Sequence, residues 1–393
     1  MRKKPLYERI RQILESARNG VARTVNTTQV VANWLIGREI VEEEQQGKRR
    51  ADYGKQVLEE LSAKLTHDFG IGYSVQNLRF IRQFYQMYPA MLGTKQIRYT
   101  LRSESTAAST SNVNLHAVRG ESMPVDEATI NEIGHALRSQ SWKPGLLHPN
   151  LSWSHYRALL RVEKQDARAF YEIEAIQNNW SARELERQIN SLLYERLALS
   201  RDKKGLMKLA TKGHQVQQPA DIFKDPVVME FLGLPATPKL VESDLEQALI
   251  NNLQSFLLEL GKGFAFISRQ ERISLDGDHF YIDLVFYHTL LKCYVLIDLK
   301  TGKLTHQDLG QLQLYVNYFD HERRTKGDNP TLGLILCTDK NDAVVRYTLG
   351  PDQRKNIFAS RYKLHLPTVA ELKTELRREL RLLEKGPKRG GKS

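Results

Sequence analysis

The segment FYIDLVFYHTLLKCYVLIDLK (residues 280–300) contains two runs of aromatic and branched aliphatic residues on either side of a short loop sequence. Two such runs, joined by the four residues 289–292, predict an antiparallel β-hairpin. If His288 faces Cys293, the register follows by counting outward along both strands. This register pairs aromatic or aliphatic residues at each of the next four steps: Tyr287 with Tyr294, Phe286 with Val295, Val285 with Leu296, and Leu284 with Ile297.

Three charged side chains should converge at the end of this hairpin. The next pair in the register is Asp283 with Asp298, whose Cβ atoms should lie about 5 Å apart on one face. Lys300 follows Asp298 by two residues and therefore projects from the same face. Two carboxylates at this separation repel each other, and burial adds a desolvation cost. The arrangement favours a divalent cation with oxygen ligands, such as Mg²⁺.

Such a site implies a definite chemistry. A cation held by Asp283 and Asp298 can polarise a phosphoryl oxygen and lower the pKa of a bound water. Lys300 can orient or deprotonate that water, or neutralise negative charge that develops in the transition state. The alternative is structural: a buried Asp–Lys ion pair, with the second aspartate at an exposed edge of the sheet.

The pattern around the hairpin alternates between helix and strand, which predicts an α/β domain over residues 221–370. An amphipathic helix is expected at 242–260, and a glycine at 261 suits its C-terminal end. The other expected elements are strands at 264–267 and 270–275, a turn at 276–278, a helix at 306–319 and a final strand at 331–337.

Residues 1–200 predict a mainly helical N-terminal domain. A helix at 53–65, a glycine-containing turn and a second helix capped by Ser74 resemble a helix-turn-helix, and an ordinary helical hairpin is the alternative. The pattern further indicates a low-complexity insertion at about 92–140, a linker at 201–220, and a C-terminal helix end with a basic tail at 371–393.

Composition narrows the class of partner. The 393-residue chain has a formal net charge of +12, which favours an anionic partner such as nucleic acid, although an acidic protein or a membrane surface also fits. No apolar run approaches the length of a transmembrane helix, so we expect a cytoplasmic protein that does not bind membranes. Cys293 and Cys337 lie in apolar runs, as small buried hydrophobic residues do, and not in the spacing of a zinc site.

The spacing D283-x14-D298-L-K300 resembles the PD-(D/E)XK nuclease superfamily. The wider chain resembles the YhcG-like family of bacterial proteins in that superfamily, which have a helical N-terminal domain and a C-terminal nuclease-like domain. This resemblance implies a restriction-endonuclease-like mixed sheet flanked by helices. It rests on LSWSHYRALL, NNWSARELERQI, DIFKDPVVMEFLGLP, DLEQALI, LLELGKGFAFISRQ, FYIDLVFYH and GQLQLYVNYFD.

The resemblance also implies roles for the residues of the hairpin. Asp283 matches the first acidic residue of the motif, and Ile282 stands where the superfamily name has proline. Asp298 matches the second acidic residue, where relatives often have the longer glutamate. Lys300 matches the lysine of the motif.

Two further residues match family positions outside the hairpin. Glu246, on the first helix of the domain, matches an acidic residue that often approaches the metal through water. Its spacing from Ser243 is also that of a capping box, so capping is the alternative. Gln311 matches a glutamine on the following helix of some nucleases, with a solvated polar face as its alternative. Gln270, on the strand before the site, is a weaker candidate.

Taken together, the residues and the resemblance predict a nuclease that hydrolyses DNA with Mg²⁺ or Mn²⁺. One alternative is a nucleic-acid-binding or assembly protein whose nuclease fold is weak or inactive. A second alternative is an RNA-directed nuclease. The helical N-terminal domain could bind nucleic acid, a protein partner or a second copy of the chain, and a role in bacterial defence or DNA recombination would suit such an enzyme.

Overall fold

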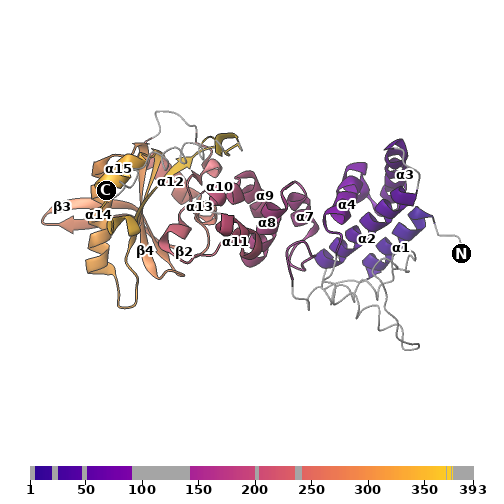
Figure 1. Ribbon diagram of the computed structural model, residues 1–393, viewed down its shortest axis with the longest axis horizontal. Coiled ribbons are helices and arrows are strands. Elements are labelled where there is room, and N and C mark those ends of the chain that lie inside the picture. The colour runs from indigo at the N-terminus through magenta and orange to yellow at the C-terminus, as the bar shows by residue number, and fades with distance from the viewer. Residues whose placement is uncertain are drawn as a thin grey trace, which may run out of the picture. The chain divides into compact units, whose positions relative to one another are not determined.

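The structure is a computed structural model that describes residues 5–19, 25–46, 51–90, 142–199, 203–234, 241–368, 370–372 and 374. The chain divides into two compact units, Met1–Ile189 and Asn190–Ser393. The first is helical, and the second combines helices with a six-stranded sheet (Figure 1). The insertion expected at 92–140 and nearly all of the C-terminal tail lie outside the described residues.

Two helices of the first unit, α4 and α9, begin where the sequence predicts a cap. Ser74 caps α4, since its hydroxyl accepts a hydrogen bond from the Asn77 amide at 3.3 Å. Ser181 and Glu184 form the reciprocal hydrogen bonds of a capping box. The described elements are α1 (Leu6–Asn19), α2 (Val25–Gln46), α3 (Ala51–Phe69), η1 (Ile71–Tyr73), α4 (Val75–Met87), α7 (Trp153–Leu159), α8 (Gln165–Gln177) and α9 (Ala182–Asn190).

The second unit is a mixed sheet in the order β1-β6-β5-β4-β3-β2, antiparallel from β2 to β4 and parallel from β4 to β1. Its strands are β1 (Val227–Val228), β2 (Phe264–Leu275), β3 (Asp278–His288), β4 (Cys293–Lys303), β5 (Leu332–Asp339) and β6 (Ile357–Lys363). Its helices are α10 (Leu193–Leu199), α11 (Lys203–Lys212), α12 (Glu242–Asn251), α13 (Leu253–Leu260), α14 (His306–Tyr318) and α15 (Asp342–Thr348), with short turns η3 (Pro219–Ile222), η4 (Glu230–Leu232), η5 (Phe319–Arg323) and η6 (Gln353–Lys355).

Four expected features differ in the structure, and the first is the linker expected at 201–220, which contains the helix α11 and belongs to the second unit. The single helix expected at 242–260 is broken at Asn252 into α12 and α13, and the two strands expected at 264–275 are the one strand β2. The run at 331–337 is not the last strand, because β6 follows it. That strand contains Ser360 and Arg361, so it lacks the continuous apolar run that identifies β5.

The predicted register of the central hairpin is confirmed at every apolar pair. His288 pairs with Cys293, and the ladder continues step by step to Leu284 opposite Ile297. The β3–β4 pairing stops there, while β4 continues alongside β5 as far as Lys303. The two strands therefore stop pairing one residue before Asp283 and Asp298.

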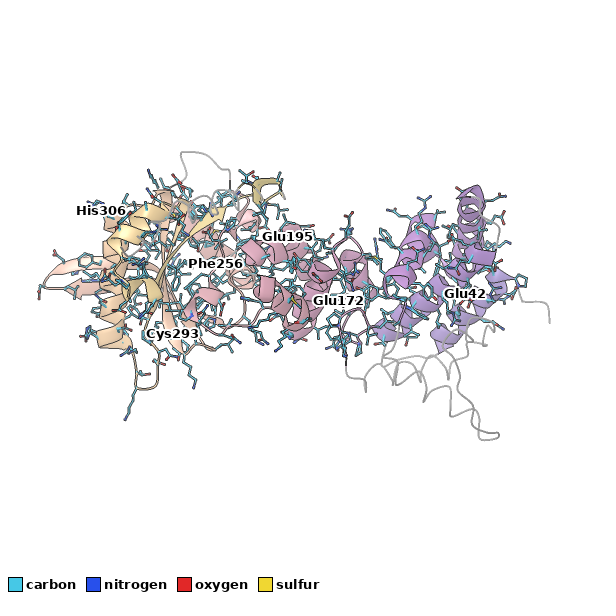
Figure 2. All side chains as sticks on the ribbon, viewed as in Figure 1. Glu42, Glu172, Glu195, Phe256, Cys293 and His306 are labelled. Atoms are coloured by element: carbon cyan, nitrogen blue, oxygen red, sulfur yellow. The ribbon has the colours of Figure 1, made fainter. Side chains whose placement is uncertain are left out.

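Helices cover both faces of the sheet and form two apolar cores. On one face, α12 and α13 pack through residues such as Leu245 and Phe256, the latter in the interior of this unit (Figure 2). On the other face, α14 packs through Leu312 and Val316. Gly333 of β5 permits this close approach, because a Cβ built there would lie only 2.8 Å from a side-chain carbon of Leu312.

The alternation of buried residues along β3 changes at Asp283. Before this residue, Phe280 and Ile282 pack into the core under α14; after it, Leu284 and Phe286 pack into the core under α12 and α13. A regular strand would keep every second residue on the same face. The strand is thus irregular at the position of the first candidate acidic residue.

Within the described residues, no helix combines the length and apolar character required to cross a membrane.

Candidate active site

Asp283 is held at the point where β3 and β4 stop pairing. Its Oδ2 accepts a hydrogen bond from the Leu299 amide of β4 at 2.8 Å, and its Oδ1 accepts one from the Gln270 side chain at 3.0 Å. The residue is half-buried, not at an exposed edge as the structural alternative requires. Burial raises the pKa of Asp283, an effect that the Leu299 hydrogen bond and the Lys300 charge oppose.

Asp298 and Lys300 form an ion pair on β4. Asp298 is only 2% exposed, and its Oδ2 lies 2.9 Å from Nζ of Lys300. The Lys300 ammonium is therefore the partner of this buried oxygen. Burial raises the pKa of Asp298 to about 7; the Lys300 charge opposes this shift and the Asp283 charge adds to it.

The ammonium of Lys300 is strongly stabilised as a cation. Burial lowers its pKa, but the charges of Asp298, Glu242 and Asp283 outweigh burial and raise the pKa to about 12. Glu242 is a site residue that the sequence analysis missed. Its Oε2 lies 3.6 Å from Nζ of Lys300, and its Oε1 accepts a hydrogen bond from the Thr301 amide at 3.2 Å. The available signal was its position one helical turn before Glu246.

Gln270 connects Glu246 with Asp283. Its Nε2 donates to Oε2 of Glu246 at 2.6 Å as well as to Asp283, and its backbone has a positive φ of 46°. Non-glycine residues with such φ values are strained and concentrate at functional sites. The capping alternative for Glu246 is wrong, because α12 begins at Glu242 with Val241 as its N-cap. Glu246 is buried, which raises its pKa.

Gln311 touches the site indirectly. Its Nε2 donates to the hydroxyl of Tyr315 at 2.5 Å, and that hydroxyl donates to the carbonyl oxygen of Tyr281 at 3.1 Å. Tyr281 lies two residues before Asp283 on β3. Gln311 and Tyr315 therefore attach α14 to the strand that carries Asp283, and Gln311 hydrogen-bonds none of the acidic residues within the described chain.

The acidic residues fit a divalent cation only with water in its shell. Within the described ranges, no three aspartate, glutamate, histidine or cysteine side chains converge as a metal cage. Mg²⁺ commonly uses one or two carboxylates and retains several waters, so two carboxylates suffice. The buried carboxylate of Asp298, whose charge Lys300 stabilises only in part, is the observation that fits such an ion best.

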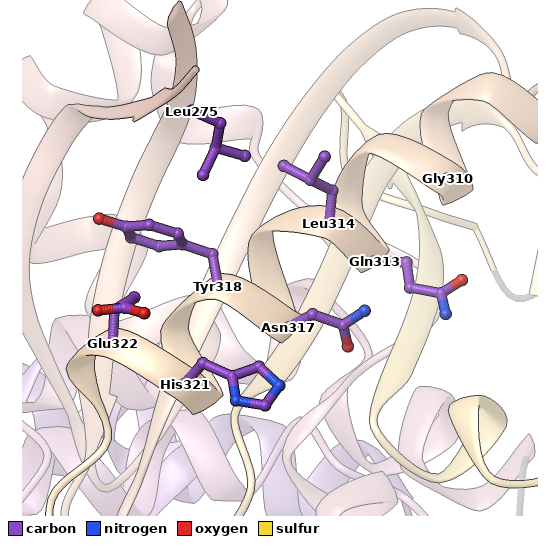
Figure 3. Close-up of a pocket in the computed structure, with 8 residues that line it drawn as sticks. All are labelled: Leu275, Gly310, Gln313, Leu314, Asn317, Tyr318, His321 and Glu322. Atoms are coloured by element: carbon purple, nitrogen blue, oxygen red, sulfur yellow. The ribbon is translucent and has the colours of Figure 1, made fainter. Parts of the chain in front are cut away.

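A shallow pocket of about 530 Å³ lies elsewhere on the second unit (Figure 3). It is lined by Leu275 of β2 and by residues of α14 and η5, among them Leu314, Tyr318 and His321. None of the acidic residues described above lines it. Its volume therefore gives no support to a site at Asp298.

Family comparisons match both units. The family model described as "YhcG PDDEXK nuclease domain" matches residues 220–381, and the "DUF1016 N-terminal domain" model matches 9–104 and 131–196. A curated relative, "Putative nuclease YhcG" of Escherichia coli (strain K12), is 36% identical over 384 residues, which cover 98% of this chain and 96% of the relative.

Similarity to solved structures is confined to about a third of the chain. A repair endonuclease from Pyrococcus abyssi matches with a TM-score of 0.23 and 15% identity, over 33% of this chain and 50% of that chain. The EndoMS-dsDNA2 complex matches with a TM-score of 0.24 and 15% identity, over 34% and 47%. Scores this low carry no argument. The 36% identity to a relative of nearly equal length does show the family: the chain belongs to the YhcG-like family of PD-(D/E)XK nucleases.

Proposed function

We propose that this nuclease hydrolyses phosphodiester bonds in DNA and depends on a divalent metal ion, Mg²⁺ or Mn²⁺, held by Asp283 and Asp298. The observation that carries the proposal is the buried carboxylate of Asp298, which is 2% exposed and has the Lys300 ammonium 2.9 Å from its Oδ2. PD-(D/E)XK nucleases generally use divalent metals. Such an ion would polarise the phosphoryl oxygen and activate water.

The side chains then have separate tasks. The Leu299 amide and the Gln270 side chain fix the Asp283 carboxylate, so that both aspartates keep their positions before substrate arrives. Lys300, with a pKa of about 12, is charged at neutral pH, and this favours orienting water or stabilising transition-state charge over deprotonating water. Glu246, joined to Asp283 through Gln270, would bind the ion through water, and Gln311 positions β3 through Tyr315.

DNA is the substrate that we propose, with the net charge of +12 as its support. Charge does not discriminate DNA from RNA, so an RNA-directed nuclease with the same site is the first alternative. The second is an assembly or binding protein whose nuclease unit is inactive. The shorter Asp298, in place of the glutamate of many relatives, is the feature that favours this second alternative.

Cleavage assays with matched variants test the proposal. Purified protein is incubated with supercoiled plasmid, linear duplex DNA and single-stranded RNA, each with Mg²⁺, Mn²⁺ or EDTA. Asp298→Asn and Lys300→Met should each reduce the DNA cleavage rate at least about a hundredfold, because each removes a group that acts on transition-state charge. Asp352→Asn is the control, since its carboxylate is exposed and pairs only with Lys355 in the described structure.

Each result separates the alternatives. Metal-dependent cleavage of DNA by wild type and Asp352→Asn, lost in Asp298→Asn, supports the proposal. Preferential cleavage of RNA would change the proposed substrate from DNA to RNA and leave the proposed catalytic residues unchanged. Equal cleavage by wild type and Asp298→Asn, or none by wild type with either metal, would overturn the catalytic assignment.

A further inference from the structure

The β2–β3 hairpin continues beyond Gln270 and Asp283 to a turn at Asp276 and Gly277, where both residues have positive φ. One face of this extension is packed. Ile273 and Ile282 are fully buried in the core under α14, and Leu275 and Phe280 pack against it. The opposite face is exposed to solvent, and it consists of Arg272, Ser274, His279 and Tyr281. We call these four residues the hairpin face.

Backbone pairing brings the four side chains of the hairpin face together. Arg272 lies opposite Tyr281, and Ser274 lies opposite His279, so each pair projects from the same side of the ribbon. Arg272 Nε donates to Ser274 Oγ at 3.2 Å, and its Nη2 lies 3.0 Å from Nε2 of His279. The guanidinium is therefore oriented by Ser274 and His279.

The charge of Arg272 has no carboxylate partner among the described residues. This distinguishes it from Arg323, which pairs with Glu271 at 3.0 Å on the packed side of the same hairpin region. Tyr281 is 48% exposed, so its ring is accessible to a ligand. An oriented arginine beside an exposed aromatic ring, a hydroxyl and an imidazole is the chemistry that nucleic-acid surfaces use.

The hairpin face begins next to the proposed active site. Arg272 follows Gln270 by two residues and Tyr281 precedes Asp283 by two residues. At the rise of a strand, two residues span about 7 Å. The hydroxyl of Tyr315, which donates to the Tyr281 carbonyl, fixes the backbone at the junction. A strand whose phosphate is at Asp283 would therefore pass directly onto this face.

We propose that the hairpin face holds the DNA strand beside the scissile phosphate. Arg272 contacts a flanking phosphate with its guanidinium, aided by Ser274 and His279, and Tyr281 stacks on a base or a sugar. This assignment rests on the proposed function and deepens it, because it adds substrate-binding residues that none of the motif positions supplies.

Binding measured without catalysis tests the assignment. Fluorescence anisotropy with labelled single-stranded and duplex DNA, in EDTA, gives Kd at several salt concentrations. Arg272→Gln keeps a hydrogen-bond donor near Ser274 but removes the charge, and Arg272→Lys restores it. Tyr281→Thr keeps a residue type that favours strands but removes the ring, and Tyr281→Phe restores the ring. Arg354→Gln removes an exposed charge on η6, beside the opposite half of the sheet.

We expect losses of DNA affinity only in the variants of the hairpin face. Arg272→Gln raises Kd about tenfold at low salt and reduces the slope of log Kd against log salt by about one. Tyr281→Thr also raises Kd about tenfold, through lost stacking. Both restoring variants and Arg354→Gln stay within about twofold of wild type. With metal present, Arg272→Gln raises KM for cleavage and leaves kcat near the wild-type value.

The failures of the two proposals are distinguishable. If wild type neither binds nor cleaves DNA, the proposed function fails and this inference fails with it. Melting temperatures first confirm that Arg272→Gln and Tyr281→Thr are folded. If wild type binds and cleaves DNA and both variants match it in Kd and KM, only the hairpin assignment is overturned. Equal losses in Arg272→Gln and Arg354→Gln would likewise overturn it, because the effect would then reflect net charge alone.

Discussion

Asp298 illustrates how a functional residue can oppose folding. A carboxylate that is 2% exposed has lost nearly all its hydration, and Lys300 compensates only in part, since the pKa of Asp298 remains raised to about 7. Because the folded pKa exceeds the ordinary value of 3.8, the protein is most stable, with respect to this group, below pH 3.8 and loses that stability as pH rises through 7. A buried catalytic acid is thus retained at a cost in stability.

A substitution at Asp298 should therefore stabilise the metal-free protein at high pH. In EDTA, Asp298→Asn is expected to exceed wild type in the free energy of unfolding by roughly 1–4 kcal/mol at pH 8, with little or no advantage at pH 4. Chemical denaturation at several pH values measures the difference. A pH-independent difference would contradict the assignment of the buried charge.

Gln270 presents a second compromise at residue scale. Its backbone is strained, and its amide separates two carboxylates that would otherwise repel each other. Gln270→Glu keeps the length of the side chain but adds a negative charge between Glu246 and Asp283. We expect the melting temperature in EDTA to fall by several degrees and the stabilisation by Mg²⁺ or Mn²⁺ to increase relative to wild type. A thermal shift assay with and without metal measures both, with Gln313→Glu as the control; unchanged metal stabilisation would contradict the prediction.

The sequence identifies some site residues more readily than others. Asp283, Asp298 and Lys300 stand out because charged residues interrupt apolar strands, and the hairpin register can be counted. Gln270 is prominent only in the structure, because its positive φ and its two carboxylate partners depend on an irregularity that no alternation rule reveals. Glu242 was missed because exposed acidic residues are common in the first turn of helices.

Elements that depend on local patterns were predicted well. The hairpin register is confirmed. It could be predicted because a shift of one residue would move apolar side chains to the wrong face of the sheet. The strand β6 was missed because its mixed sequence does not have the pattern of a strand. Its pairing with β5 holds it in the sheet. The break between α12 and α13 was missed because apolar residues continue across Asn252 at nearly helical spacing.

The packing of α14 on β5 gives a prediction at element scale. A Cβ at Gly333 would lie 2.8–2.9 Å from side-chain carbons of Leu312 and Val316, closer than real contacts allow. Gly333→Ala should therefore destabilise the protein by roughly 1–3 kcal/mol, because α14 must shift outward. Gly310→Ala, in α14 itself with no atom within 4 Å of its Cβ, should stabilise by roughly 0.5–1 kcal/mol through helix propensity. Equilibrium denaturation compares them, and equal effects would contradict this account of the packing.

At the scale of the whole molecule, family boundaries and structural units do not coincide. The N-terminal family model ends at residue 196 and the nuclease model begins at 220, whereas the second compact unit begins at Asn190. Arg196 explains the difference. Its fully buried guanidinium pairs with Glu259 at 2.5 Å and donates to the carbonyl oxygen of Pro226 at 2.9 Å. Residues assigned by sequence to one domain thus complete the core of the other.

A fragment that begins at residue 190 should therefore be more stable than one that begins at 220. The shorter fragment removes Arg196 and leaves the buried Glu259 without this cation; loss of one partner of a buried ion pair costs roughly 3–5 kcal/mol. Arg196→Met in the longer fragment should reproduce most of that loss, whereas Arg354→Gln, an exposed site, should not. Calorimetry of the four proteins measures the difference. If the fragment from 220 melts at the same temperature as the fragment from 190, the buried pair does not stabilise the nuclease unit, and the family boundary describes the folding unit better than the contacts do.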